Sequence, residues 1–243
     1  MSQQKTYSIK CPECDHDQET ELYESINIGT DPELRDALLA NRVNNIECES
    51  CAFEFRVEKT LLYNDPLRGF MVYCVPESEG NPEQITEMIQ RAVSESEAAC
   101  PDHTPGPAIH LTATRTEMIE KLFMLEAELD PRIIEYIKYS IFNRNPEELP
   151  PREKGLLFDA EDSTDEHLLF VVQDLESGEL ETVLQYSRAG YAALCEMFDK
   201  DEETADLLEL FPGPYINARQ AMLDELDELF DSCLLYTSDA ADE

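Results

Sequence analysis

The chain has 243 residues, of which 54 are acidic and 18 are basic, so its formal net charge at pH 7 is -36. A surface of this charge repels nucleic acid, and without clustered lysine and arginine there is no gain from counterion release, so direct binding of DNA or RNA is disfavoured. No stretch approaches the roughly 18 to 20 apolar residues of a membrane span, and the first ten residues have no apolar signal core. We therefore expect a cytoplasmic protein without membrane segments.

Residues 1–76 are predicted to form a β unit around two CxxC pairs, Cys11 with Cys14 and Cys48 with Cys51. Strands are expected at residues 6–9, 19–28, 53–62 and 70–75, the last two joined by a turn that contains Asn64-Asp65-Pro66 and Arg68-Gly69. Asp31 and Pro32 have the pattern of a helix N-cap followed by proline at the first helical position. A short helix is therefore expected between the two CxxC pairs, ending near Asn41.

Residues 77–150 are predicted to be mainly helical and to pack on the N-terminal unit. Asn81 and Pro82 resemble a cap for a helix with apolar residues at helical spacing up to Val93. A loop is expected at residues 94–107, a strand at 108–114, a helix from Thr116, and a further helix capped by Asp130.

Residues 151–232 are predicted to be an antiparallel β meander followed by helices. Strands are expected at residues 155–159, 167–173 and 181–185, followed by a helix capped by Ser187 and a last helix at 216–230. The chain as a whole is therefore predicted to be α+β. We expect residues 233–243 to be the translation of a sequencing adapter rather than natural sequence, which would mean that the natural C-terminus is missing, and we leave them out of the fold prediction.

The two CxxC pairs predict a metal site. Cys11, Cys14, Cys48 and Cys51 can bring four thiolates to one ion, and four cysteines form the closed tetrahedral shell typical of structural zinc. Catalytic zinc keeps one position open for water, so this ligand set indicates a scaffold role. The expected cofactor is therefore Zn²⁺, with Cys11, Cys14, Cys48 and Cys51 as its ligands.

Two other readings of the cysteines stay open at this stage. A redox dithiol and a different metal such as iron are both compatible with CxxC pairs, although a thioredoxin-like pair usually lies at a helix N-terminus. The residues after the second cysteine of each pair are Asp15 and Ala52, where glycine is usual, which can weaken the turns. Cys74, Cys100 and Cys195 lie outside the pattern and are expected to be ordinary thiols.

No catalytic motif is recognised. The sequence has no phosphate-binding glycine-rich loop, nucleophile elbow or HExxH helix, and its four histidines are scattered. Because the four thiols already complete the metal shell, His16 is expected to be exposed or hydrogen-bonded to a neighbour. His103 and His110 are expected to be loop and strand-edge residues, and His167 a surface residue at the start of a strand. An enzyme with a carboxylate site among the many acids is left open.

The N-terminal residues resemble the CpXC domain family of bacterial and archaeal proteins. The resemblance rests on CPEC, on INIGTDPELRDALLANRVNNIECESC, and on LLYNDP and MVYCVP, which look like the family's first knuckle, helix, second knuckle and hairpin. It covers about residues 9–76, with a weaker continuation to about 142. It implies a zinc-ribbon-like domain in which Cys11, Cys14, Cys48 and Cys51 are the motif cysteines, and it implies no activity, because the family is functionally uncharacterised.

These observations favour a structural zinc site in a protein that binds or assembles with an unknown protein partner. The hairpin of residues 53–75 or the helical faces would supply the contact surface. A thiol-based redox or zinc switch is the alternative, and the oligomeric state cannot be read from the sequence.

Overall fold

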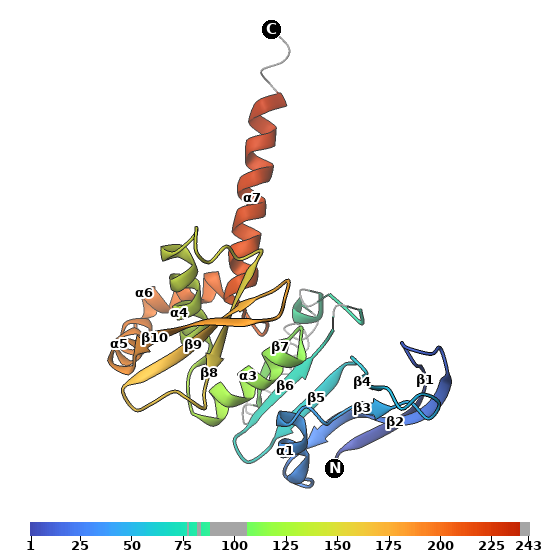
Figure 1. The fold of residues 1–243 in the computed structure, drawn as a ribbon. Helices are drawn as coiled ribbons and strands as arrows, with labels where there is room; N and C mark the ends of the chain where they lie inside the picture. The colour runs from blue at the N-terminus through green and yellow to red at the C-terminus, as the bar shows by residue number, and fades with distance from the viewer. Residues whose placement is uncertain (77, 82–83, 88–105, 239–243) are drawn as a thin grey trace. The chain divides into compact units, whose positions relative to one another are not determined.

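A computed structural model describes residues 1–76, 78–81, 84–87 and 106–238 (Figure 1). It confirms an α+β fold built from mixed and antiparallel sheets with helices. The chain divides into two compact units. Unit 1 contains Met1–Leu122 and Gly213–Tyr215, and unit 2 contains Phe123–Pro212 and Ile216–Glu243. The helix predicted at residues 81–93 lies mostly outside the described residues.

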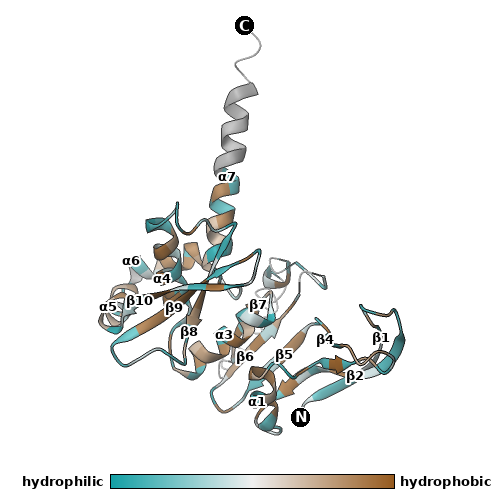
Figure 2. Ribbon diagram, viewed as in Figure 1, coloured by the Kyte–Doolittle hydropathy of each residue, from teal (hydrophilic) through white to brown (hydrophobic). Residues whose placement is uncertain are grey.

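Unit 1 is built on a five-stranded sheet in the order β1-β2-β5-β6-β7. These strands are β1 (Gln3–Lys10), β2 (Asp17–Asn27), β5 (Leu61–Asp65), β6 (Phe70–Cys74) and β7 (Ala108–Thr112). The β1–β2 and β5–β6 pairs are antiparallel hairpins, whereas β2–β5 and β6–β7 are parallel pairs. The strand β1 is an exposed edge strand, and most of it is hydrophilic in Figure 2.

A separate two-stranded ribbon completes unit 1. It consists of β3 (Asn45–Glu47) and β4 (Glu54–Arg56), and α1 (Glu33–Leu39) precedes it in the chain. The prediction of one strand over residues 53–62 was wrong, because the chain leaves the small ribbon after β4 and enters the main sheet at β5.

The predicted capping role of Asp31 in α1 was also wrong. Pro32 occupies the N-cap position, and the Asp31 carboxylate accepts a hydrogen bond of 2.9 Å from the Ser2 backbone N–H.

The β5–β6 turn is fixed by a buried carboxylate. Asp65 is fully buried, and its Oδ1 accepts hydrogen bonds of 3.0 Å from the backbone N–H groups of Leu67 and Arg68. Its Oδ2 accepts from the Arg68 guanidinium at 2.7 Å. Gly69 has a φ of 73°, a conformation that glycine adopts without a steric cost. This local chemistry confirms the predicted turn.

Unit 2 contains an antiparallel meander and helices. The sheet order is β10-β9-β8, with β8 (Lys154–Asp159), β9 (His167–Asp174) and β10 (Leu180–Ser187). Its helices are α4 (Pro131–Arg144), α5 (Arg188–Phe198), α6 (Asp201–Leu210) and α7 (Ala218–Ser238), and α3 (Arg115–Glu126) crosses the boundary between the units. The meander is confirmed, α6 was not predicted, and α7 continues past the predicted end at residue 230.

Two predicted caps of unit 2 are confirmed by hydrogen bonds. Asp130 accepts from the Arg132 backbone N–H at 2.8 Å at the start of α4, and Ser187 accepts from the Gly190 N–H at 3.0 Å at the start of α5. The helix α3 starts one residue earlier than predicted, because Thr114 rather than a later residue provides its cap. Thr114 Oγ1 accepts from the Glu117 N–H at 3.1 Å, and Glu117 accepts from the Ala113 N–H at 2.8 Å.

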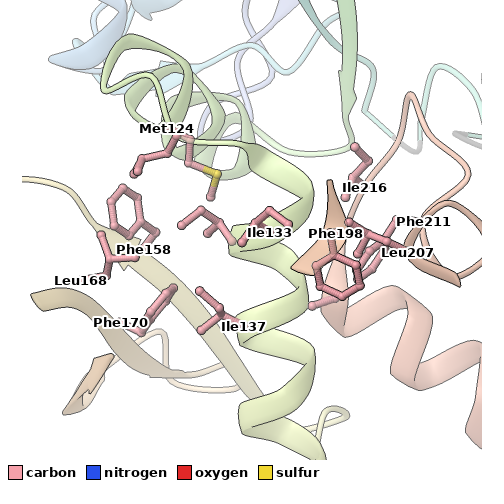
Figure 3. Packing of buried hydrophobic residues seen from close by; sticks show 13 residues of the cluster. Met124, Ile133, Ile137, Phe158, Leu168, Phe170, Phe198, Leu207, Phe211 and Ile216 are labelled. Carbon is pink, nitrogen blue, oxygen red and sulfur yellow. The ribbon is translucent and has the colours of Figure 1, made fainter. Parts of the chain in front are cut away.

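The core of unit 2 lies between α4 and the meander. Ile133 and Ile137 of α4 contact Phe158, Leu168 and Phe170 from β8 and β9 (Figure 3). Further buried side chains close the cluster: Phe198 of α5, Leu207 of α6, and Phe211 and Ile216 from the connection between α6 and α7. The amphipathic pattern of residues 131–144 is explained by this packing, since burial of apolar side chains is the main stabilising force.

Candidate metal centre

The two CxxC pairs lie in the turns of two β-hairpins. Lys10 and Asp17 form the last pair of the β1–β2 ladder, and residues 11–16 connect them. Glu47 and Glu54 form the corresponding pair of the β3–β4 ladder, and residues 48–53 connect them. Both CxxC sequences therefore occupy loops of the same length at the ends of antiparallel strand pairs.

The backbone hydrogen bonds of the two loops repeat each other. In the first loop the Cys11 N–H donates to the His16 carbonyl at 2.9 Å, and the Asp15 N–H donates to the Cys11 carbonyl at 3.0 Å. In the second loop the equivalent bonds are Cys48 N–H to the Phe53 carbonyl at 2.9 Å and Ala52 N–H to the Cys48 carbonyl at 2.8 Å. The local fold of each loop is thus set by main-chain bonds and not by the particular side chains that follow the cysteines.

Both loops use a left-handed residue after the second cysteine. Asp15 has a φ of 59° and Ala52 a φ of 58°. This is the region that glycine enters freely and that other L-residues enter at a cost of about 1–2 kcal/mol. Asp15 and Ala52, which stand where glycine is usual, therefore adopt the left-handed conformation at the cost of strain in the turns.

Replacing Ala52 with glycine is expected to stabilise unit 1 by about 0.5–1 kcal/mol, because it removes the Cβ from a left-handed position. Chemical denaturation at a fixed metal concentration measures the effect. Ala40, which is also exposed but has a φ of -79°, is the matched control, and glycine there is expected to give no gain. Equal effects of the two substitutions would contradict the assignment of strain to residue 52.

The fold brings all four cysteine sulfurs together. The Sγ atoms of Cys11, Cys14, Cys48 and Cys51 all lie within 4.8 Å of one another. The Cys11 and Cys51 sulfurs are 3.7 Å apart, and the Cys14 and Cys48 sulfurs are 3.6 Å apart, so these close pairs join one loop to the other. The cluster could hold a metal ion.

Each loop contributes one inner and one outer sulfur. Cys11 and Cys48 are buried, whereas Cys14 and Cys51 are exposed. Burial raises the pKa of Cys48, but the backbone N–H groups of Cys51 and Ser50 donate to its sulfur, and its pKa is lowered to about 6. A hydrogen bond from Phe53 lowers the pKa of Cys51, but desolvation and the neighbouring sulfurs outweigh it and raise that pKa to about 12. The pKa of Cys14 is likewise raised: a hydrogen bond from the His16 backbone lowers it, but desolvation and the Cys48 sulfur prevail.

Two polar side chains fix one hairpin against the other. Gln18, 8% exposed at the start of β2, donates from Nε2 to the Glu47 carbonyl at 3.1 Å and accepts from the Glu49 N–H at 3.0 Å. Asn44 accepts from the Tyr23 N–H at 2.8 Å and donates to the Tyr23 carbonyl at 3.0 Å. The Gln18 amide thus holds the residues on both sides of Cys48, and neither residue could be singled out from sequence spacing.

Replacing Gln18 with alanine is expected to weaken metal binding by about 10–100-fold, the usual effect of removing a group that orients a ligand. The hydrogen bonds with the Glu47 carbonyl and the Glu49 N–H are lost while all four sulfurs remain. Competition with a chromophoric chelator measures the affinity. Gln4→Ala on the exposed face of β1 is the control and should bind as the unaltered protein does; a loss of the same size there would refute a specific role for Gln18.

The other residues singled out in the sequence lie apart from this cluster or outside the described part. Cys74 is buried at the end of β6, and Cys195 lies in α5. His110 is in β7, and His167 begins β9. His103 and Cys100 lie outside the described residues.

Among the described residues, no helix is long and apolar enough to cross a membrane.

The two hairpins with their CxxC loops form a ribbon-type arrangement whose four cysteine sulfurs are close enough together to hold a metal ion. The CpXC protein family model matches residues 9–138, more than half of the chain, and the protein belongs to this family. A search of curated proteins and a search of solved structures gave no significant match. The family match covers the end of β1, the other four strands of the five-stranded sheet, both cysteine loops and part of α4, so it extends well beyond the cysteine loops.

Proposed function

We propose that Cys11, Cys14, Cys48 and Cys51 bind one zinc ion that holds the two hairpins of unit 1 together. The proposal rests on the four sulfurs within 4.8 Å of one another. Zinc–sulfur bonds of about 2.3 Å in a tetrahedron require sulfur separations of about 3.8 Å. The Cys11–Cys51 and Cys14–Cys48 separations, 3.7 and 3.6 Å, are within 0.2 Å of that value. The residues present therefore fit a tetrahedral ion.

A structural role follows from the ligand set. Four thiolates complete the coordination of zinc and leave no position for a water molecule, so the ion would act as a cross-link and not as a Lewis acid toward a substrate. Without it, the approach of the two cysteine hairpins would depend on the hydrogen bonds of the Gln18 and Asn44 amides. Small ribbons of this kind generally need a metal to fold.

The biological role that we propose is binding or assembly with a protein partner in the cytoplasm. Two hairpin tips of unit 1 carry exposed apolar side chains: Leu67 at the β5–β6 turn is 84% exposed, and Phe53 in the second cysteine loop is 42% exposed. Phe53 stacks on Phe55 at a centroid distance of 6.2 Å. Exposed aromatic and aliphatic residues on a rigid turn are suited to insertion into a partner's pocket.

Photo-crosslinking in the source cells tests this role. A photoreactive amino acid at position 67 or 53 is expected to give a discrete crosslinked protein. The same group at Leu208 of α6, which is 43% exposed, is the control and should not give that product. Crosslinking only at position 208, or at none of the three positions, would count against the hairpin tips as the contact surface.

Elemental analysis of protein purified without an affinity metal tests the zinc site. One zinc per chain is expected in the unaltered protein and in Cys195→Ser, and none in Cys11→Ser. Iron in place of zinc would revise the metal, and a folded, metal-free protein with four titratable thiols in the cluster would refute the site.

Zinc binding is expected to release about two or more protons per ion at pH 7, because Cys14 and Cys51 have raised pKa values and are protonated in the metal-free protein. Cys48, with a pKa of about 6, is already mostly ionised and contributes little. Affinity should therefore fall as the pH is lowered. Calorimetry in buffers of different ionisation enthalpy measures the released protons; release of fewer than one would contradict these protonation states.

A thiol switch is the second candidate, favoured by the exposure of Cys14 and Cys51. In that function a peroxide would oxidise pairs of these thiolates to disulfides, itself be reduced to water, and set the zinc free. A zinc-indicator assay under increasing peroxide measures the release. Zinc that stays bound at doses that oxidise Cys195 would exclude the switch.

A further inference from the structure

Unit 1 contains a buried cation that has no role in the cysteine cluster. Arg115 is the first residue of α3 and is only 3% exposed. It follows β7, which runs parallel to β6, and these strands end at Thr112 and Cys74. Its Nε, Nη1 and Nη2 atoms are all shielded from solvent and have no hydrogen-bond partner among the described residues.

Such a guanidinium needs an acceptor. Arginine remains protonated in proteins, and it presents five N–H donors in a planar fork. An unpaired buried charge costs several kcal/mol, and each unmade hydrogen bond adds to that cost. Burial lowers the pKa of Arg115, and the nearby Cys74 and Glu58 act against this shift.

The neighbouring groups do not neutralise it. Burial raises the pKa of the Cys74 thiol to about 11, so this thiol is uncharged at neutral pH. The Glu58 carboxylate is 43% exposed and is paired with Arg56. Glu117, the acid in the first turn of α3, already accepts from the Ala113 N–H in the capping arrangement. Glu117 thus has a hydrogen-bond donor at the first turn of the helix, whereas the Arg115 guanidinium has no hydrogen-bond partner in the part of the chain that the structure describes.

We propose that Arg115 is the binding group of an internal site for a small oxyanion, a carboxylate or a phosphate group. Both present two oxygens at the spacing that a guanidinium fork recognises in a bidentate manner. The net charge of -36 opposes general adsorption of anions to the surface, so a saturable effect of phosphate on this protein would indicate a local site. Because the guanidinium nitrogens are shielded from solvent, an anion can reach them only when the surrounding structure opens locally. The protein should therefore be equilibrated with the anion before measurement.

Thermal unfolding of the full chain at constant ionic strength tests the proposal, with chloride replaced by inorganic phosphate in one series and by acetate in another. The unaltered protein should gain about 3–6 °C in its unfolding midpoint at ten times the dissociation constant of the bound anion. A gain with phosphate alone or with acetate alone identifies the group that is bound. Zinc content is measured in the same samples, so that a change at the cysteine cluster is not mistaken for anion binding.

Two variants locate the effect. Arg115→Met should lose the anion-dependent gain and should be at least as stable as the unaltered protein in chloride, because an apolar side chain replaces an unpaired charge. Arg35→Met, which removes an arginine that pairs with Asp36 at the surface of the same unit, should keep the gain. If Arg115→Met does not fold, equilibrium dialysis of labelled phosphate and acetate against the unaltered protein and Arg115→Lys replaces the scan, with at least tenfold weaker binding expected for the lysine variant.

The proposal is overturned if neither anion raises the midpoint, or if the gain persists in Arg115→Met. It is equally overturned if Arg115→Met is strongly destabilised in chloride, since that would show an internal partner for the guanidinium. In the dialysis experiment, the proposal is overturned if neither anion binds the unaltered protein, or if Arg115→Lys binds the anion as tightly as the unaltered protein does.

Discussion

Replacing Cys48 with serine is expected to unfold the two cysteine hairpins while unit 2 remains folded. A serine hydroxyl is not ionised at neutral pH and does not substitute for the buried thiolate, so the tetrahedral shell is broken. The apparent free energy of structural zinc binding in small ribbons is about 10–16 kcal/mol at pH 7, which exceeds the total stability of most domains of this size. The loss should therefore reach well beyond the substituted residue.

Hydrogen–deuterium exchange read by mass spectrometry measures how far the unfolding extends. Peptides from β1 to β4 should lose their protection, and peptides from β8 to β10 should keep theirs, because the core of unit 2 is made from its own residues. Cys195→Ser is the control, since this thiol lies in α5, apart from the cluster. Unchanged protection of β1 to β4 in Cys48→Ser would show that the hairpins fold without a metal.

Replacing Lys138 with methionine is expected to cost about 3–5 kcal/mol of the stability of unit 2, because it leaves a buried carboxylate without its counter-charge. The side chains of Lys138 and Glu135 are 4% and 5% exposed, and Lys138 Nζ lies 3.0 Å from Glu135 Oε1. The other carboxylate oxygen accepts from the Ala218 N–H at 2.8 Å, which joins α4 to the start of α7. The pair therefore holds two helices together.

Urea denaturation of the variants measures this cost. The double variant Glu135→Gln with Lys138→Met should recover most of the loss, since the glutamine keeps an acceptor for Ala218 and neither substituted position carries a charge. The control is Arg152→Met, which removes one member of an ion pair with Asp227 whose side chains are 57% and 65% exposed, and it should cost less than about 1 kcal/mol. Equal losses in Lys138→Met and Arg152→Met would contradict a buried pair.

The sequence was sufficient to predict the cysteine cluster because its determinants are local. Each CxxC pair lies in one hairpin loop, and the flanking strands pair with each other, so only the approach of two hairpins had to be inferred. The caps at Asp130 and Ser187 could be predicted for the same reason. Their side-chain oxygens bond to backbone groups two and three residues away.

The remaining features depend on contacts between distant residues. The parallel pairing of β2 with β5 and of β6 with β7 depends on contacts between strands that are distant in the sequence. No residue pattern within one strand encodes it. Gln18 is one of several polar residues in an alternating strand, and its role appears only when the second hairpin lies beside it. Arg115 likewise resembles an ordinary first-turn residue until its burial is known.

X-ray absorption spectroscopy at the zinc edge, on protein purified without an affinity metal, tests the four-cysteine zinc site. The spectrum should show four sulfur neighbours at about 2.3 Å and no nitrogen or oxygen neighbour. A coordination shell that contains nitrogen or oxygen, or a protein that is folded and carries no zinc, would contradict a structural site made of Cys11, Cys14, Cys48 and Cys51.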